Sequence, residues 1–114
     1  MSSCIFCKIA AKEIPSQVVY EDNDVLAFND LNAQAPVHVL VIPKKHLSHL
    51  DHAAAEDELL LGRLLSAASK VAKSTAIAET GYRVVTNIGV DGGQSVSHLH
   101  FHILGGRQLS WPPG

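Results

Sequence analysis

The sequence predicts an α+β domain in which an antiparallel sheet carries one long helix on one face. Short segments rich in β-branched residues predict the strands, and one long segment with apolar residues at helical spacing predicts the helix. The 114 residues are 46% apolar and 18% charged, a composition that supports one modest hydrophobic core. We therefore expect a single domain over residues 1–114.

Five segments have the composition of strands. Gln17 to Glu21 and Val25 to Asn29 are joined by a tight polar turn, which predicts a hairpin. The third strand runs from His38 to Ile42, and the fourth and fifth are expected at Tyr82 to Ile88 and Val96 to Leu104. Their order along the chain is hairpin, strand, helix, strand, strand, which indicates a five-stranded antiparallel sheet.

Two helices are expected. From about Ala54 to Ala78 the period changes, and a face of apolar residues recurs at spacings of three and four: Leu61, Leu64, Leu65, Ala68, Val71 and Ala72. Acidic residues at 56–58 occupy the first turns, where the helix dipole favours them, and Gly81 is placed to end the segment. Ile5 to Ala11 predicts a short N-terminal helix that stops before Pro15.

Charge and hydropathy exclude several classes of function. The formal net charge is -2 with neutral histidines, and no basic stripe exists, so we expect no nucleic-acid partner. No run of about 18 apolar residues exists, so we expect no membrane-spanning helix. Residues 1–4 lack the charged and apolar regions of a signal peptide, so we expect a cytoplasmic protein.

Residues 98–102 read His-Leu-His-Phe-His and are the most informative segment of the chain. In a strand, successive side chains point to opposite faces, so all three imidazoles share one face while Leu99 and Phe101 face the other. Neighbouring imidazoles then lie roughly 6.5–7 Å apart. Two functions fit this row: a metal site, because imidazoles are common transition-metal ligands, or nucleophilic catalysis in which one imidazole attacks and its neighbours orient it.

Imidazole attack on phosphorus requires a site for an anionic phosphate, and the loop before the histidines is a candidate. Gly92 and Gly93 allow backbone N–H groups to approach phosphate oxygens closely, and Ser95 offers a hydroxyl donor. Cys4 and Cys7 form a short pair that fits either a redox motif or half of a zinc site. The redox alternative lacks the βαβ pattern that usually accompanies it.

The chain resembles the histidine-triad nucleotide-binding family, specifically its Hint branch. The family signature alternates three histidines with apolar residues, and residues 98–104, His-Leu-His-Phe-His-Ile-Leu, match it in full. The resemblance covers the chain from about residue 4 to residue 114. Further matching segments are Ile5-Phe6-Cys7-Lys8-Ile9, Gln34-Ala35-Pro36, Val41-Ile42-Pro43-Lys44-Lys45-His46, Asp91-Gly92-Gly93-Gln94-Ser95-Val96, Leu104-Gly105-Gly106-Arg107-Gln108 and Trp111-Pro112-Pro113-Gly114.

This resemblance implies a purine nucleoside phosphoramidase, which cleaves the P–N bond between a nucleoside monophosphate and an amine. By analogy, His100 is the nucleophile and His102 contacts the phosphate. His98 holds the histidine network from the other side, and His38 contributes through its own hydrogen bonds. Ser95 helps to protonate the departing amine. No cofactor is required for this chemistry.

The resemblance also implies how a nucleotide is held. Asp30 binds the ribose hydroxyls, because one carboxylate accepts two hydrogen bonds. Asn87 hydrogen-bonds near the α-phosphate, and backbone groups of Gly93 and Gln94 complete the phosphate cradle. The apolar residues that match the base pocket of the family are Ile5, Phe6, Ile9, Phe28 and Leu31.

Zinc-bearing relatives in this superfamily imply a metal set of Cys4, Cys7, His46 and His98, which is a closed and therefore structural site. Zinc remains an open expectation, because many Hint relatives lack the cysteines. The family forms homodimers in which edge strands join two sheets and the C-terminal tail reaches the neighbouring site. Other functions left open are a dinucleoside polyphosphate hydrolase, a nucleotide-binding regulatory protein with little catalysis, and a zinc protein that binds no nucleotide.

Two positions depart from the Hint pattern. Ser97 stands where many relatives carry a tyrosine, and Ser110 stands where a histidine is frequent. Both positions are expected near the leaving group. These departures therefore bear on the choice of amine, whereas the reaction type depends on the intact histidines.

Overall fold

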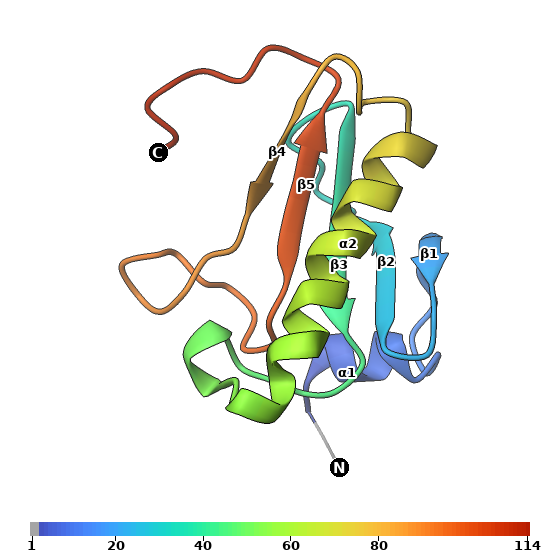
Figure 1. Ribbon diagram of the computed structural model, residues 1–114, viewed down its shortest axis with the longest axis vertical. Coiled ribbons are helices and arrows are strands. Elements are labelled where there is room, and N and C mark those ends of the chain that lie inside the picture. Colours follow the sequence, from blue (N-terminus) through green and yellow to red (C-terminus); the bar gives the residue numbers. More distant parts are fainter. Residues whose placement is uncertain (1–2) are drawn as a thin grey trace.

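The computed structural model describes residues 3–114, so Met1 and Ser2 and the expectation about a leader there lie outside it. A five-stranded antiparallel sheet carries the long helix α2 across one face, and the short helix α1 lies at one end (Figure 1). The strand order in the sheet is β1-β2-β3-β5-β4. The strands are β1 (Val18–Glu21), β2 (Val25–Asn29), β3 (Val37–Pro43), β4 (Tyr82–Val85) and β5 (Phe101–Gly105), and the helices are α1 (Ile5–Ala10) and α2 (Glu58–Ser74). The predicted α+β fold is therefore confirmed.

Side-chain alternation along the central strands divides the core into two layers. One layer packs β2, β3 and β5 against α2 and contains Val39, Val41 and Ile103. The other contains Leu40 and Ile42 from the opposite face of β3, packed against α1. Apolar side chains cover both faces of the sheet. His98 and His100, which point into the α1 layer, are therefore buried.

The fifth strand begins at Phe101, so the predicted start at Val96 is wrong. Phe101 pairs with Val41, and β3 ends two residues later at Pro43, which has no N–H to extend the ladder. The backbone before Phe101 is held in other ways, because the N–H of Leu99 donates to the carbonyl of Leu47 at 2.6 Å. The fourth strand likewise ends at Val85, earlier than predicted.

The alternation of side chains nevertheless continues through residues 98–100. Leu99 is buried in the α2 layer with Phe101, while the rings of His98 and His100 contact the ring of Phe6 in α1. The prediction that the three histidines share one face does not depend on regular strand pairing. It requires only an extended backbone.

Helix α2 is shorter than predicted, because a 3₁₀ turn at Ala55–Asp57 precedes it. Leu65 is half exposed, so its assignment to the buried face is wrong, and Ala67 is buried instead. The helix ends at Ser74, well before Gly81. Ala76 takes the left-handed conformation at φ 64°, and the N–H of Ile77 donates to the carbonyl of Ala72 at 3.0 Å, which closes a Schellman motif.

Within residues 3–114, neither helix combines the length and the apolar character that crossing a membrane requires.

Candidate active site and metal centre

Four histidines lie close together where β3 and β5 meet α1. The ring centroids of His100 and His102 are 5.1 Å apart, and His38 on β3 lies 5.1 Å from His102. His38, His98 and His100 are buried, and the edge-on ring of Phe6 lies 5.1 Å from His100. The structure therefore brings together all four histidines predicted to be catalytic.

Hydrogen bonds determine which nitrogen of His100 carries its proton. Its Nδ1 lies 2.7 Å from the backbone carbonyl oxygen of His98, and a carbonyl only accepts. Nδ1 therefore holds the hydrogen of the neutral ring, and Nε2 holds a lone pair. Thr86 holds the backbone of His100 in place, because its hydroxyl donates to the carbonyl of His100 at 2.8 Å. The chain thus presents His100 as a nucleophile through Nε2.

A second chain of hydrogen bonds orients His102. The backbone N–H of Gln34 donates to Nδ1 of His38 at 3.0 Å, which places the proton of neutral His38 on Nε2. This Nε2 lies 2.9 Å from Nδ1 of His102 and donates to it. The proton of neutral His102 is therefore on its own Nε2, away from His38. Such a ring can donate a hydrogen bond to an anion.

Burial keeps both members of this pair neutral near pH 7. The pKa of His102 is lowered to about 4, chiefly by desolvation and to a smaller extent by the nearby His100 and His38, while Asp30 acts in the opposite direction. Desolvation also lowers the pKa of His38, against the opposing charge of Asp30, whose Oδ2 lies 3.3 Å from Nε2 of His38.

Asp30, His38 and His102 also satisfy the distance requirement for a metal site, since their ligand atoms lie within 4.8 Å of one another. The hydrogen bonds favour a different interpretation. Nε2 of His38 carries the proton and has no lone pair to give a metal, because Gln34 donates to Nδ1. This group is therefore better described as a proton-ordered hydrogen-bond chain.

The two chains of hydrogen bonds end at a cavity of about 500 Å³, a size common for small-molecule sites. His38, His100, His102 and Ser95 line one part of it. The predicted nucleotide-binding residues that also line it are Ile5, Phe6, Ile9, Phe28, Asp30 and Leu31. The cavity wall thus combines imidazoles and a carboxylate with apolar side chains.

The loop before the histidines differs from the predicted phosphate cradle. Asn87, Gly93 and Gln94 do not line the cavity. The N–H of Gly93 donates to the carbonyl of Val90 at 3.1 Å, and that of Gln94 donates to the carbonyl of Gly89 at 3.0 Å, so the loop uses both donors internally. Within the loop, Ser95 is the predicted residue that reaches the cavity.

The side chain of Gln94 has a structural function. Its amide nitrogen donates to the carbonyls of Ser48 at 2.7 Å and Val96 at 3.0 Å, and its oxygen accepts from the N–H of Gly89 at 3.0 Å. These bonds fasten the loop that carries Ser95 to the segment after β3. No sequence pattern distinguishes this glutamine from one that binds a ligand.

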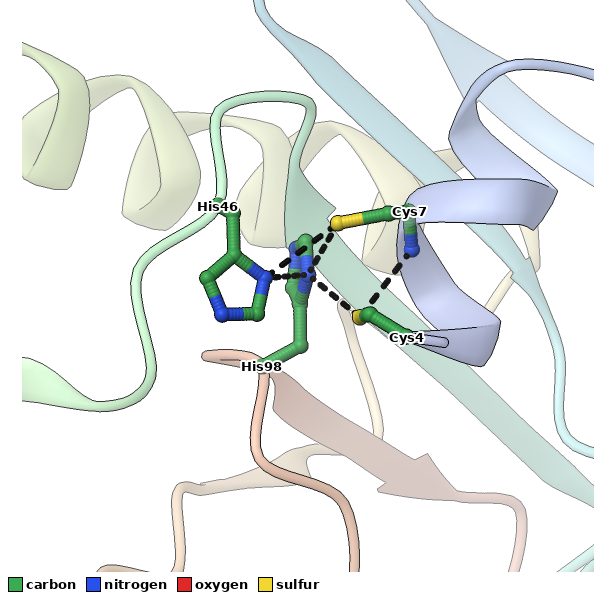
Figure 2. A group of neighbouring side chains, drawn as sticks. All are labelled: Cys4, Cys7, His46 and His98. Atoms are coloured by element: carbon green, nitrogen blue, oxygen red, sulfur yellow. Dashed lines mark hydrogen bonds between the residues drawn. The ribbon is translucent and has the colours of Figure 1, made fainter. Parts of the chain in front are cut away.

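The predicted metal ligands meet at the N-terminal end of α1 (Figure 2). Nδ1 of His98 lies 3.3 Å from Sγ of Cys4, 3.5 Å from Sγ of Cys7 and 3.2 Å from Nδ1 of His46. Sγ of Cys7 lies 3.2 Å from Nδ1 of His46. Ligand atoms on a tetrahedral zinc are separated by roughly 3.3–3.8 Å, given Zn–N and Zn–S bonds of roughly 2.0–2.3 Å.

The hydrogen bonding of His98 also fits a metal ligand. Its Nε2 donates to the carbonyl of Pro43 at 2.9 Å, so the lone pair of the neutral ring is on Nδ1, the atom that faces both sulfurs. His98 is fully buried, and desolvation lowers its pKa, while the bond to Pro43 acts in the opposite direction. The donor set of two thiols and two imidazoles is that of a structural zinc site.

Sequence reasoning missed four groups that order the site: the carbonyls of Pro43 and His98, the backbone N–H of Gln34 and the hydroxyl of Thr86. Three of them are backbone groups, so residue type carries no information about them. Thr86 lay inside the predicted fourth strand, where a threonine is unremarkable. These contacts were accessible only through the fold.

The fold and the site define a class of protein, an α+β domain with histidines from β3, from β5 and from the segment just before β5 around a cavity on the α1 side of the sheet. The family description "HIT domain" matches residues 11–109. An uncharacterized HIT-like protein of Synechocystis sp. is 56% identical over 110 residues, which are 96% of each chain.

Solved structures agree with this match. A HIT family hydrolase of Legionella pneumophila is 50% identical, has a TM-score of 0.95, and is aligned over 98% of this chain and 100% of that one. A histidine triad protein of Clostridium difficile is 50% identical, has a TM-score of 0.93, and is aligned over 96% of both chains. This protein therefore belongs to the HIT domain family.

Proposed function

We propose that this protein hydrolyses the P–N bond of purine nucleoside 5′-monophosphoramidates through a nucleotidyl-histidine intermediate. The observation that carries the proposal is the proton arrangement of His100, whose Nδ1 is bound to the carbonyl of His98 and whose Nε2 is free to attack. This ring lines a cavity that also contains Ser95 and Asp30. The similar Legionella pneumophila protein is described as a HIT family hydrolase.

The reaction takes two steps. Nε2 of His100 attacks phosphorus, the P–N bond to the amine breaks, and the amine nitrogen gains a proton through the Ser95 hydroxyl. Water then attacks the same phosphorus, the bond to His100 breaks, and the nucleoside monophosphate leaves. The proton that water releases replaces the one that the amine took. His102 donates from Nε2 to the phosphate oxygens as negative charge grows on them.

Substrate binding uses both the apolar and the polar residues of the cavity wall. The apolar residues on α1 and β2, including Phe6 and Phe28, are suited to an uncharged purine. Asp30 is suited to the ribose hydroxyls, because its Oδ2 faces the site while Oδ1 accepts from the N–H of Asn32 at 2.9 Å.

The test is release of a fluorescent amine from an adenosine phosphoramidate, measured beside hydrolysis of diadenosine polyphosphates. We expect faster cleavage of the phosphoramidate, and His100→Asn to lower the rate by several orders of magnitude. His52→Asn is the matched control, because this histidine is exposed in the turn Leu50–His52. Preferential cleavage of the polyphosphate would assign the alternative hydrolase, and binding without turnover would indicate a regulatory nucleotide-binding protein.

A quenched reaction tests the intermediate directly. Mass spectrometry of the trapped protein should find the nucleotidyl mass on the peptide that contains His100. An adduct on His102, or none during rapid turnover, would refute the mechanism.

We also propose that Cys4, Cys7, His46 and His98 hold a structural zinc ion. When bound, zinc supplies a fixed junction between α1 and the segment before β5, with all four positions filled by protein. The reducing conditions of a cytoplasmic location suit the two thiolates. Elemental analysis of protein purified without chelators or a metal-affinity tag should give about one zinc per chain. A value below about 0.2 would reject the site.

A homodimer is the oligomeric state we propose. β4 is an edge strand of the sheet, and its Tyr82 and Val84 are 38% and 39% exposed. Trp111 in the tail is 80% exposed, which fits a residue that reaches a second subunit. Light scattering should give twice the chain mass. Deletion of residues 111–114 should change turnover or amine preference while leaving the fold intact, and unchanged kinetics would discard a role for the tail in the partner's site.

A further inference from the structure

Arg107 lies just after β5, on the surface, and is outside the cavity. Its Nε and Nη2 donate to the carbonyl of Gln34 at 3.3 and 3.0 Å, and its Nη1 donates to the carbonyl of Gln108 at 3.1 Å. The guanidinium therefore joins the start of the C-terminal tail to the loop between β2 and β3. Nothing in the proposed reaction uses this side chain.

The loop that Arg107 holds connects two residues of the site, Asp30 and His38. The N–H of Asn32 donates to Oδ1 of Asp30, and the amide nitrogen of Gln34 donates to the carbonyl of Asn32 at 3.0 Å. The N–H of Gln34 then donates to Nδ1 of His38 at 3.0 Å. Gln34 is thus bound on one side to the catalytic histidines and on the other to Arg107.

The loop has little else to hold it. Residues 31–34 are exposed, and Leu31 is 97% exposed, so apolar burial does not fix their position. Apart from Arg107, the tail approaches the loop closely at Gly106, where an added Cβ would lie 2.9 Å from Cβ of Pro36. Gly106 has φ 91°, which only glycine adopts without strain. The Gly106–Arg107 segment is therefore shaped to lie against this loop.

We propose that Arg107 is a positioning residue that keeps the proton of His38 on Nε2. By holding the carbonyl of Gln34, it keeps the N–H of the same residue on Nδ1 of His38. This arrangement makes His38 a donor to His102 and leaves the proton of His102 on the nitrogen that meets the phosphate. The consequence for turnover rests on the proposed phosphoramidase, whereas the consequence for His38 does not.

A lysine cannot replace this arginine. The planar guanidinium reaches two carbonyls with three N–H groups in one fixed geometry, whereas an ammonium is a point charge on a flexible stem. We therefore compare Arg107→Lys and Arg107→Ala with Arg83→Lys. Arg83 is the matched control because its Nη2 also donates to a tail carbonyl, that of Ser110 at 2.9 Å, without touching the loop.

Nitrogen-15 NMR of the histidine rings is the decisive measurement, and it needs no substrate. In the wild type and in Arg83→Lys, Nδ1 of His38 should give the shift of a hydrogen-bonded, unprotonated nitrogen. In both Arg107 variants this signal should move toward the average of two tautomers. An unchanged His38 signal in a folded Arg107→Ala variant overturns the proposal.

Kinetics provide the second readout. We expect kcat to fall about tenfold in Arg107→Ala, about the effect of losing hydrogen bonds from a charged donor, with a smaller change in KM. Added guanidinium at millimolar concentration should restore part of kcat in Arg107→Ala, and methylammonium should not. An equal loss in Arg83→Lys would assign the effect to the tail as a whole and overturn the proposal. Absence of phosphoramidase activity in the wild type would refute the proposed function and leave the NMR test of Arg107 intact.

Discussion

Phe6 is the aromatic side chain of helix α1 that packs against His98 and His100, and Phe6→Leu tests that contact. The ring of Phe6 is 7% exposed. It makes edge-on contacts with Phe28 at 5.6 Å, with His98 at 5.9 Å and with His100 at 5.1 Å. Leucine keeps an apolar residue at this position and removes all three ring contacts.

The magnitude follows from these contacts. An aromatic pair contributes about 0.5–1.5 kcal/mol beyond the burial of its area, and the three contacts share one ring, so we expect a loss of about 2 kcal/mol. For a chain of this size the loss lowers the melting temperature by roughly 8 °C. Turnover per folded molecule should fall about fivefold, the equivalent of about 1 kcal/mol, because the edge of Phe6 no longer steadies the His100 ring.

Urea unfolding followed by circular dichroism measures the free energy, and Ile9→Leu is the control. Ile9 is on the same helix and in the same core cluster, is equally buried, and makes no ring contact, so its replacement should cost less than about 1.5 kcal/mol. A double-mutant cycle with Phe28→Leu should give a coupling of about 0.5–1.5 kcal/mol. A Phe6→Leu protein as stable as Ile9→Leu, with the turnover of the wild type per folded molecule, would show that the ring contacts do not support the site.

Three further predictions concern stability. Ala76→Gly should raise the free energy of unfolding by about 0.5–1 kcal/mol in urea, because Ala76 has φ 64°, and a loss would contradict the Schellman end of α2. Burial lowers the pKa of His102 to about 4, so the unfolded chain binds more protons between pH 6.5 and 4. Stability should therefore fall as pH falls through that range, by at most about 1.4 kcal/mol per pH unit, and His102→Gln should flatten the curve. A wild-type curve no steeper than that of the variant would argue against a neutral buried ring. Asp57→Ala should lower the melting temperature by about 5 °C, because the carboxylate accepts from Nζ of Lys45 at 2.6 Å and from the N–H of Ala54 at 2.9 Å. Asp57→Asn keeps the bond from the N–H of Ala54 and should lower the melting temperature by less than Asp57→Ala. An equal decrease in both variants would assign the whole effect to the Lys45 contact.

Local patterns predicted most of the fold. The strand order along the chain, the long helix and the shared face of the three histidines all follow from short-range periodicity, and the structure agrees with them. Errors occurred at the ends of elements. The end of a strand depends on its partner, as Pro43 shows for β5, and the end of α2 depends on a backbone conformation that alanine rarely adopts.

The candidate site was likewise predicted in part from the sequence. Residue types and their spacing, together with the resemblance, identified the cavity-lining histidines, Ser95, Asp30 and the cluster of Cys4, Cys7, His46 and His98. The resemblance implied that the backbone groups of Gly93 and Gln94 bind phosphate, and neither residue type nor spacing reveals that a backbone donor is already engaged. Their N–H groups are taken up within their own loop.

The amino-acid sequence alone determined which imidazoles lie on the same side of the chain, because an extended backbone alternates its side chains wherever it goes. Only the tertiary structure decided where the proton of each imidazole is. That choice depends on the carbonyls of His98 and Pro43 and on the N–H of Gln34, which the fold brings to the rings. A neutral histidine has one proton and two nitrogens, and the neighbour that accepts or donates decides between them.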